Sequence, residues 1–208
     1  MKKLLIAAVA GVGLLLSLPS MAQTGVRFGI KAGANLNFPS VKYGNISVSG
    51  DSRFGFFGGG LLEISPNTPK NKFKIQLEAL YNRVNMQYSG ADTLGYSKAR
   101  INVNQISVPL VAKYFILPQL SINVGPTINF NLNATGSMAG ADGKFVDAGD
   151  ADGLKTFQLG LAAGASYYLY KGLFLDARYT PLFGSLNDDA SGEKVKVSAV
   201  QLGIGYKF

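Results

Sequence analysis

The sequence contains no cysteine, no histidine and no tryptophan. Without cysteine, the chain can form no disulfide, no thiolate metal site and no thiol nucleophile. Without histidine, it lacks Ser-His hydrolase chemistry, histidine-based metal sites and the usual switch near neutral pH. These absences argue against an enzyme and give no reason to expect a bound cofactor or metal.

Long apolar runs are nearly absent too, and the single exception lies at the start. Lys2 and Lys3 precede an uncharged apolar run from Leu4 to Leu18, and small residues flank Met21 at Ser20 and Ala22. This pattern predicts a secretory signal peptide over residues 1–22, which is too short to span a membrane as a helix. The remaining residues, 23–208, are expected to form one domain without a membrane helix.

The formal net charge is +8, but its lysines and arginines are scattered along the chain rather than clustered. A protein that binds nucleic acid concentrates such charge on one face or along one helix. The sequence therefore predicts no nucleic-acid partner.

What the chain does contain is alternation of apolar and polar residues with a period of two, which indicates β-strands. Eight segments show it: residues 26–38, 53–65, 73–82, 101–115, 120–132, 157–169, 173–179 and 200–208. One of them changes phase, because Ile101 and Val103 alternate out of step with Ile106 and Val108. A β-bulge near Asn104 would reconcile the two halves.

The connections between these segments alternate between long and short. Long loops are expected at residues 39–52, 89–97, 133–153 and 184–193, the last two of them acidic, and a tight turn at 170–172. Aromatic residues collect near both ends of the strands, at Phe28, Phe73, Tyr114, Tyr167 and Phe208 on one rim and at Phe38, Phe54, Phe130, Phe157 and Tyr179 on the other. Two such girdles are typical of a membrane barrel rather than of a soluble sandwich.

The sequence thus predicts an all-β fold: a transmembrane antiparallel β-barrel of about eight strands, of the small OmpA and OmpX type, after a cleaved signal peptide. Its last segment ends on aromatic residues in the apolar phase, Tyr206 and Phe208. This ending looks like the C-terminal strand of bacterial outer-membrane proteins. The likeness implies that Tyr206 and Phe208 form an assembly signal read by the barrel assembly machinery.

Four segments resemble the PorT-like family of outer-membrane β-barrels. They are GIKAGANL (29–36), SVPLVAKY (107–114), DARY (176–179) and GYKF (205–208). The resemblance implies an eight-stranded porin-like barrel in the bacterial outer membrane. The family's namesake is associated with secretion of surface proteins, and the family supplies no catalytic or ligand residues to carry over.

Three charged residues on the inward phase fall at a similar depth in their strands, namely Lys31, Glu78 and Arg178. They could form a constriction or gate in the lumen. They could equally form a structural ion network, since buried charges need partners and about eight strands leave room only for side chains. The structural role is the favoured reading. The other inward charges, Arg27, Glu63, Lys74, Lys113, Asp176 and Lys207, are expected nearer the periplasm, with an excess of positive charge.

Two functions remain open at this stage. The first is a non-enzymatic, porin-like protein that is structural or weakly permeable to small solutes. The second is an interaction module whose outer loops contact a secretion or surface component. In either case the expected surroundings are outer-membrane lipid and lipopolysaccharide, and the expected state is a monomer.

Overall fold

The computed structural model describes residues 25–43, 46–66, 72–89, 96–140, 144–150, 155–184 and 193–208. The expected signal peptide lies outside these residues. The strands are β1 (Val26–Tyr43), β2 (Ile46–Ser49), β3 (Arg53–Ile64), β4 (Phe73–Ser89), β5 (Tyr96–Leu117), β6 (Leu120–Gly140), β7 (Phe145–Asp150), β8 (Phe157–Tyr170), β9 (Leu173–Phe183) and β10 (Glu193–Lys207). Over the same residues, no helix is long and apolar enough to cross a membrane.

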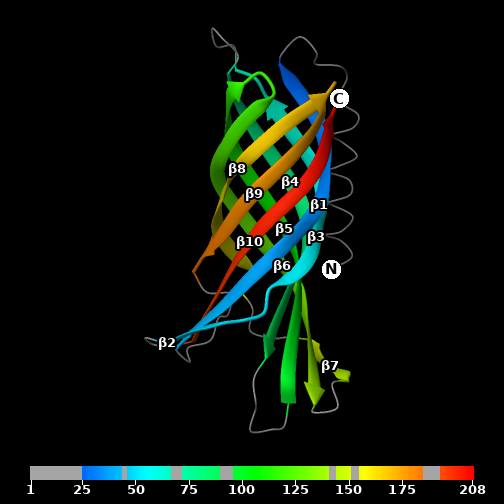
Figure 1. The fold of residues 1–208 in the computed structure, drawn as a ribbon, viewed down its shortest axis with the longest axis vertical. Helices are drawn as coiled ribbons and strands as arrows, with labels where there is room; N and C mark the ends of the chain where they lie inside the picture. The colour runs from blue at the N-terminus through cyan, green and yellow to red at the C-terminus, as the bar shows by residue number, and fades with distance from the viewer. Residues whose placement is uncertain are drawn as a thin grey trace.

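Eight of these strands form one closed antiparallel barrel, in the order β1-β3-β4-β5-β6-β8-β9-β10. Closure comes from the pairing of β10 with β1, whose register runs from Gly29 opposite Lys207 to Tyr43 opposite Glu193. The short strands β2 and β7 pair only with the far ends of β1 and β6. Figure 1 shows the strands crossing the barrel obliquely, with β2 and β7 at the end opposite the C-terminus. The predicted fold class is confirmed.

We call the two ends of the barrel the loop end, which carries β2 and β7, and the turn end. At the turn end β8 and β9 are joined by Lys171 and Gly172, which both have positive φ angles, 37° and 93°. Glycine adopts such angles without steric cost, so the predicted tight turn at 170–172 forms there. A two-residue turn at 118–119 joins β5 to β6 at the same end.

The alternation divides the residues between two environments, as expected. Apolar side chains such as Ile30, Val124 and Leu202 point outward and are 52–61% exposed. Polar residues at neighbouring positions, such as Lys31, Asn123 and Gln201, point inward and are buried. An interior of polar residues within an apolar exterior is the reverse of a soluble barrel and fits one surrounded by lipid.

The phase change in the fourth predicted strand has a different cause from the one expected. Strand β5 alternates without interruption, and Val103 points inward at 1% exposure, in phase with Gln105. The extra residue lies on β6 instead, where Asn104 pairs with Asn133 but Gln105 pairs with Asn131. A register shift is thus present at Asn104 and Gln105, as predicted, but the expectation that it reverses the phase of this strand is wrong. It rested on treating every apolar residue as outward-facing.

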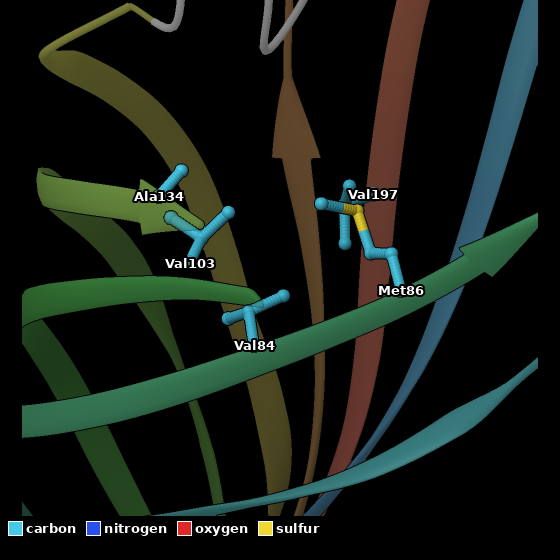
Figure 2. Close-up of a cluster of buried hydrophobic side chains, with 5 residues drawn as sticks. All are labelled: Val84, Met86, Val103, Ala134 and Val197. Atoms are coloured by element: carbon cyan, nitrogen blue, oxygen red, sulfur yellow. The ribbon is translucent and has the colours of Figure 1, made fainter. Parts of the chain in front are cut away.

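Val103 faces inward because the loop end of the interior is apolar. It belongs to a buried cluster with Val84, Met86, Ala134 and Val197, drawn from β4, β5, β6 and β10. Figure 2 shows these side chains converging inside the ribbon. The cluster lies between the polar interior and the loop end of the barrel.

Several segments expected to be loops continue as strands. Strand β1 reaches Tyr43, β4 reaches Ser89 and β6 reaches Gly140, each well past its last outward aromatic residue. Backbone pairing needs no apolar face, so the ladder extends beyond the apolar band where the side chains are polar. Parts of the acidic loops, including Asp142, Asp152, Asp188 and Asp189, lie outside the described residues.

Inward-facing glycines serve two purposes. Gly33 and Gly203 leave room for the ring of Phe57, which a Cβ atom at either position would touch. A Cβ atom at Gly59 would instead collide with the carbonyl oxygen of Ala79 on the neighbouring strand. Glycine at such positions permits the strong bending of strands that a narrow barrel requires.

Candidate functional site

The barrel interior holds four charged side chains at one level, which we call the central charge layer: Lys31, Glu78, Asp176 and Arg178. They come from β1, β4 and β9, and none of the four residues is more than 3% exposed. Two positive and two negative charges make the layer neutral if all four are ionised. The three residues singled out from the sequence, Lys31, Glu78 and Arg178, are thus brought together by the structure.

Glu78 is the centre of this layer. Arg178 donates two hydrogen bonds to its carboxylate, from Nη2 to Oε1 at 2.8 Å and from Nη1 to Oε2 at 3.0 Å. The Lys31 Nζ lies 2.9 Å from Oε2, and Gln76 donates an amide hydrogen to Oε1 at 2.5 Å. Such two-pronged arginine–carboxylate pairs are among the strongest and most directional hydrogen bonds in proteins.

Asp176 completes the layer, although its sequence position suggested a place nearer the periplasm. Its Oδ1 lies 3.0 Å from the Nζ of Lys31 and 3.4 Å from the Nη2 of Arg178. Its Oδ2 accepts a hydrogen bond from the hydroxyl of Ser166 at 2.8 Å. Long lysine and arginine side chains reach across depths that strand counting treats as separate, which is why the alternation alone could not place Asp176 here.

A second cluster, the turn-end cluster, surrounds Glu63. Lys74 and Lys207 both form ion pairs with this carboxylate, the first at 3.1 Å, and the hydroxyl of Tyr168 donates to it at 3.3 Å. Lys113 donates to the same hydroxyl at 3.3 Å and has no ion pair with any carboxylate in the described residues. The turn-end cluster therefore contains three lysines, Lys74, Lys113 and Lys207, and one carboxylate, Glu63, which agrees with the excess of positive charge expected at this end.

Between the central charge layer and the apolar cluster lies a polar cavity of about 30 Å³. Most of the residues that line it carry amide or hydroxyl groups, including Asn35, Asn82, Gln105, Ser107 and Gln201, and Val84, Leu182 and Val197 line its apolar side. Three more lining atoms have no hydrogen-bond partner within the described part of the protein: Asn37 Oδ1, Asn129 Nδ2 and Thr180 Oγ1. A polar cavity of this size holds a few water molecules rather than a solute.

The proposed assembly signal lies on the outer wall of the barrel. Tyr206 and Phe208 are 42% and 67% exposed, and their rings meet edge to face with centroids 5.4 Å apart. The backbone of Phe208 donates to the carbonyl of Phe28 at 2.9 Å, which holds the end of β10 against β1. Recognition of these residues by the assembly machinery stays a prediction.

The described residues contain no group of three or more acidic side chains that could hold a metal ion. The interior carboxylates of Glu63, Glu78 and Asp176 are instead paired with lysine and arginine side chains. Chemically, the arrangement suits a rigid filling of the barrel more than turnover of a substrate, because each carboxylate already has two or more donors.

Comparison with known proteins agrees with this architecture. Residues 21–188 match the family described as "Outer membrane protein beta-barrel domain". Among solved structures, the chain is similar to Neisserial surface protein A (NspA), with 15% identity over 87% of this chain and 97% of that one and a TM-score of 0.52. No curated protein matches the chain.

Two further solved structures show weaker likeness. One is Ail, the attachment invasion locus protein of Yersinia pestis, in complex with a heparin analogue (16% identity, 88% of this chain, 99% of that chain, TM-score 0.48). The other is OprG of Pseudomonas aeruginosa (16% identity, 89% of this chain, 97% of that chain, TM-score 0.44). The family match covers most of the sequence, and the barrel, its apolar wall and its polar interior agree with it. The chain therefore belongs to the outer-membrane protein β-barrel domain family and is a protein of the bacterial outer membrane.

Proposed function

We propose that this protein is a non-enzymatic barrel with a closed interior, and that it works at its outer surface as an interaction module. One observation carries the closed interior. The side chains of Lys31, Glu78 and Arg178 are 0% exposed, and that of Asp176 is 1% exposed. Water reaches none of these charges to any extent, so the central charge layer leaves no open path for solutes at its level.

The loop end supports the second half of the proposal. In barrels of this kind, short turns face the periplasm and long connections face the outside. The outer connections here are built as strands, with β4, β5, β6 and β7 paired side by side beyond the apolar wall. A paired outer extension holds its side chains in fixed positions, which favours binding of a partner.

The resemblance to the PorT-like family narrows the expected partner. Its four segments lie in β1, β5, β9 and β10, all of them strands of the closed barrel. We place the chain in that narrower group as part of this proposal. Since the family's namesake is associated with secretion of surface proteins, the partner is a secretion or surface component.

A weakly permeable, porin-like barrel is the second candidate. It is favoured by the polar cavity and by three buried polar atoms along β6 that have no hydrogen-bond partner among the described residues: Ser121 Oγ, Asn123 Oδ1 and Thr127 Oγ1. These atoms would line a hydrated column if the central charge layer opened. The excess of lysines in the turn-end cluster would then favour anions.

Conductance of the refolded protein in planar bilayers separates the two candidates. The closed barrel predicts silence for the wild type, while replacement of Lys31, Glu78 or Arg178 lowers stability. Steady wild-type conductance that changes with those replacements would refute the closed interior.

The interaction itself is tested in intact cells with a photo-crosslinking residue at Val146, which is 67% exposed on β7. The same crosslinking residue at Leu202, on the lipid-facing wall, is the control. A defined secretion or surface protein should be recovered from position 146 alone, and recovery of the chain itself would refute the expected monomer.

A further inference from the structure

Two arginines on the outer extension are held together without a negative charge between them. The Nη1 of Arg53 and the Nε of Arg100 both donate to the same amide oxygen, Gln87 Oε1, at 3.0 and 2.9 Å. Neither arginine forms an ion pair with a carboxylate in the described part of the chain. Two positive charges that share one neutral acceptor repel each other, so the arrangement is incomplete without an anion.

The pair is fixed in place by its neighbours. The guanidinium of Arg100 lies over the ring of Phe145 on β7, 3.4 Å from its centroid. Stacking of this kind orients the planar group, and no other described residue accepts a hydrogen bond from the Nη donors at its edge. Arg100 therefore presents a fork whose direction is set before any ligand arrives.

The amide of Gln87 is oriented as well. Its Nε2 donates to Asp51 Oδ2 at 3.0 Å, and Ser89 donates to the same oxygen at 2.5 Å. Hydrogen bonds from Ser89 and Gln87 hold the pKa of Asp51 below its ordinary value, so the carboxylate is ionised at neutral pH. An ionised Asp51 can only accept, which turns the amide oxygen of Gln87 toward the arginines.

The position of the pair relative to the membrane limits the kind of anion. The last outward aromatic residue of β4 is Tyr81, and Gln87 lies six residues farther along that strand. At about 3.3 Å per residue and a tilt of roughly 40°, the pair stands about 15 Å outside the apolar wall. This is the level of the sugar headgroups of an outer-leaflet glycolipid.

The surface between the membrane and the pair suits a phosphorylated sugar better than an acidic protein. It carries Arg83 on β4, opposite the neutral amide of Asn104 on β5, with the amide of Asn102 farther toward the loop end. Amides donate to and accept from sugar hydroxyls, whereas the planar fork of arginine matches a phosphate with two parallel hydrogen bonds. This surface lies on the side wall of the extension, where a neighbouring lipid headgroup can reach it.

We propose that Arg53 and Arg100, positioned by Gln87 and Phe145, form a clamp for a phosphate oxyanion carried by the sugar headgroup of an outer-leaflet glycolipid. The proposal deepens the proposed function and rests on it, since it names a ligand class for the outer surface. The clamp would hold the outer extension against the membrane surface and so set the orientation in which it meets its partner.

Binding of rough-type lipopolysaccharide with a phosphorylated inner core, measured by thermophoresis on the full protein in detergent micelles, tests the clamp. Replacing Arg53→Gln or Arg100→Gln should weaken binding about tenfold, since each change removes hydrogen bonds between two charged groups. Arg100→Lys keeps the charge but loses the stacked fork, and it should weaken binding nearly as much. Lys196→Gln removes the same charge from an exposed position on β10 and should change binding less than about twofold, as a surface charge remote from the ligand does.

Two further probes identify the source of the phosphate. The same lipopolysaccharide after removal of its phosphates by hydrogen fluoride should bind no better than the Arg100→Gln variant binds the intact lipid. Inorganic pyrophosphate should bind weakly and show the same dependence on Arg53 and Arg100. If pyrophosphate shows that dependence and intact lipopolysaccharide does not, the clamp holds and its lipid source is refuted.

The clamp is overturned if Arg100→Lys binds like the wild type, if Lys196→Gln loses as much as Arg100→Gln, or if removal of phosphate has no effect. Each variant must first show the heat-modifiable migration of a folded barrel, and all of these residues lie on the surface of the extension. Failure of the clamp leaves the conductance and crosslinking tests unaffected. Steady conductance, conversely, would refute the closed barrel without touching the lipid result.

Discussion

Glu78 is the residue whose replacement tests the closed interior most directly. Its carboxylate lies between Lys31 and Arg178 and accepts four close contacts, from Arg178 twice, from Lys31 and from Gln76. Glu78→Gln keeps the shape of the side chain but leaves two buried cations facing the single carboxylate of Asp176. Breaking a buried pair in this way costs about 3–5 kcal/mol, and the remaining amide oxygen places this variant near 3 kcal/mol.

The free energy of unfolding can be measured by urea titration in lipid vesicles, with heat-modifiable electrophoretic mobility as the signal of the folded barrel. The midpoint should fall while the slope of the transition is unchanged, because the change affects stability and not the surface exposed. Thr127→Val is the matched control in the same interior. The hydroxyl of Thr127 is buried without a partner in the described residues, so its removal should cost less than about 1 kcal/mol.

A double variant makes the prediction sharper. Glu78→Gln combined with Arg178→Gln removes one charge of each sign and leaves Lys31 paired with Asp176. The double variant should be no less stable than Glu78→Gln alone. The coupling energy between Glu78 and Arg178 then lies toward the upper end of the roughly 0.5–3 kcal/mol range for residues in contact. If Glu78→Gln lowers the free energy of unfolding by less than about 1 kcal/mol, and if the two substitutions act additively in the double variant, the charges of the central layer are in contact with water. The closed interior would then be wrong.

Two other predictions concern the wall of the barrel. Val124 faces outward within the apolar band of β6, so Val124→Arg should cost about 2–4 kcal/mol, whereas Asn133→Arg, beyond the apolar wall, should cost about 0–1 kcal/mol. If both arginine variants lower the free energy of unfolding equally in the same vesicle titration, the lipid does not surround the barrel at the level of Val124. Gly59→Ala should destabilise the barrel by about 1–3 kcal/mol, because its Cβ atom would strike the carbonyl of Ala79. At the neighbouring Gly60 a Cβ atom would meet no atom closer than 3.9 Å, so Gly60→Ala should leave the barrel as stable or slightly more stable. If both alanine variants behave alike, the close strand contact at Gly59 does not limit the fold.

One regularity of the sequence, the alternation of apolar and polar residues, predicted which side chains form the outer wall of the barrel and which fill its interior. Successive side chains of a strand point to opposite faces, so the phase of Ile30 against Lys31 already decides which residue meets lipid and which is enclosed. The same regularity predicted about eight strands and the tight turn at 170–172. It also placed Lys31, Glu78 and Arg178 on the inward face, and their positions along their strands gave them a similar depth.

The register and tilt of the strands decided which side chains meet inside and outside the barrel, since alternation carries no information about contacts between residues on different strands. Asp176 joins the central charge layer because the side chain of Lys31 on β1 reaches it on β9, a distance set by how the strands are staggered. Val103 turns inward because the interior is apolar at the loop end, which the pattern of a single strand cannot report. The pairing of Arg53 with Arg100 depends on three strands and on β7, whose segment 145–150 was predicted to be a loop. Contacts between strands are fixed by closure of the barrel, and closure is a property of the tertiary structure alone.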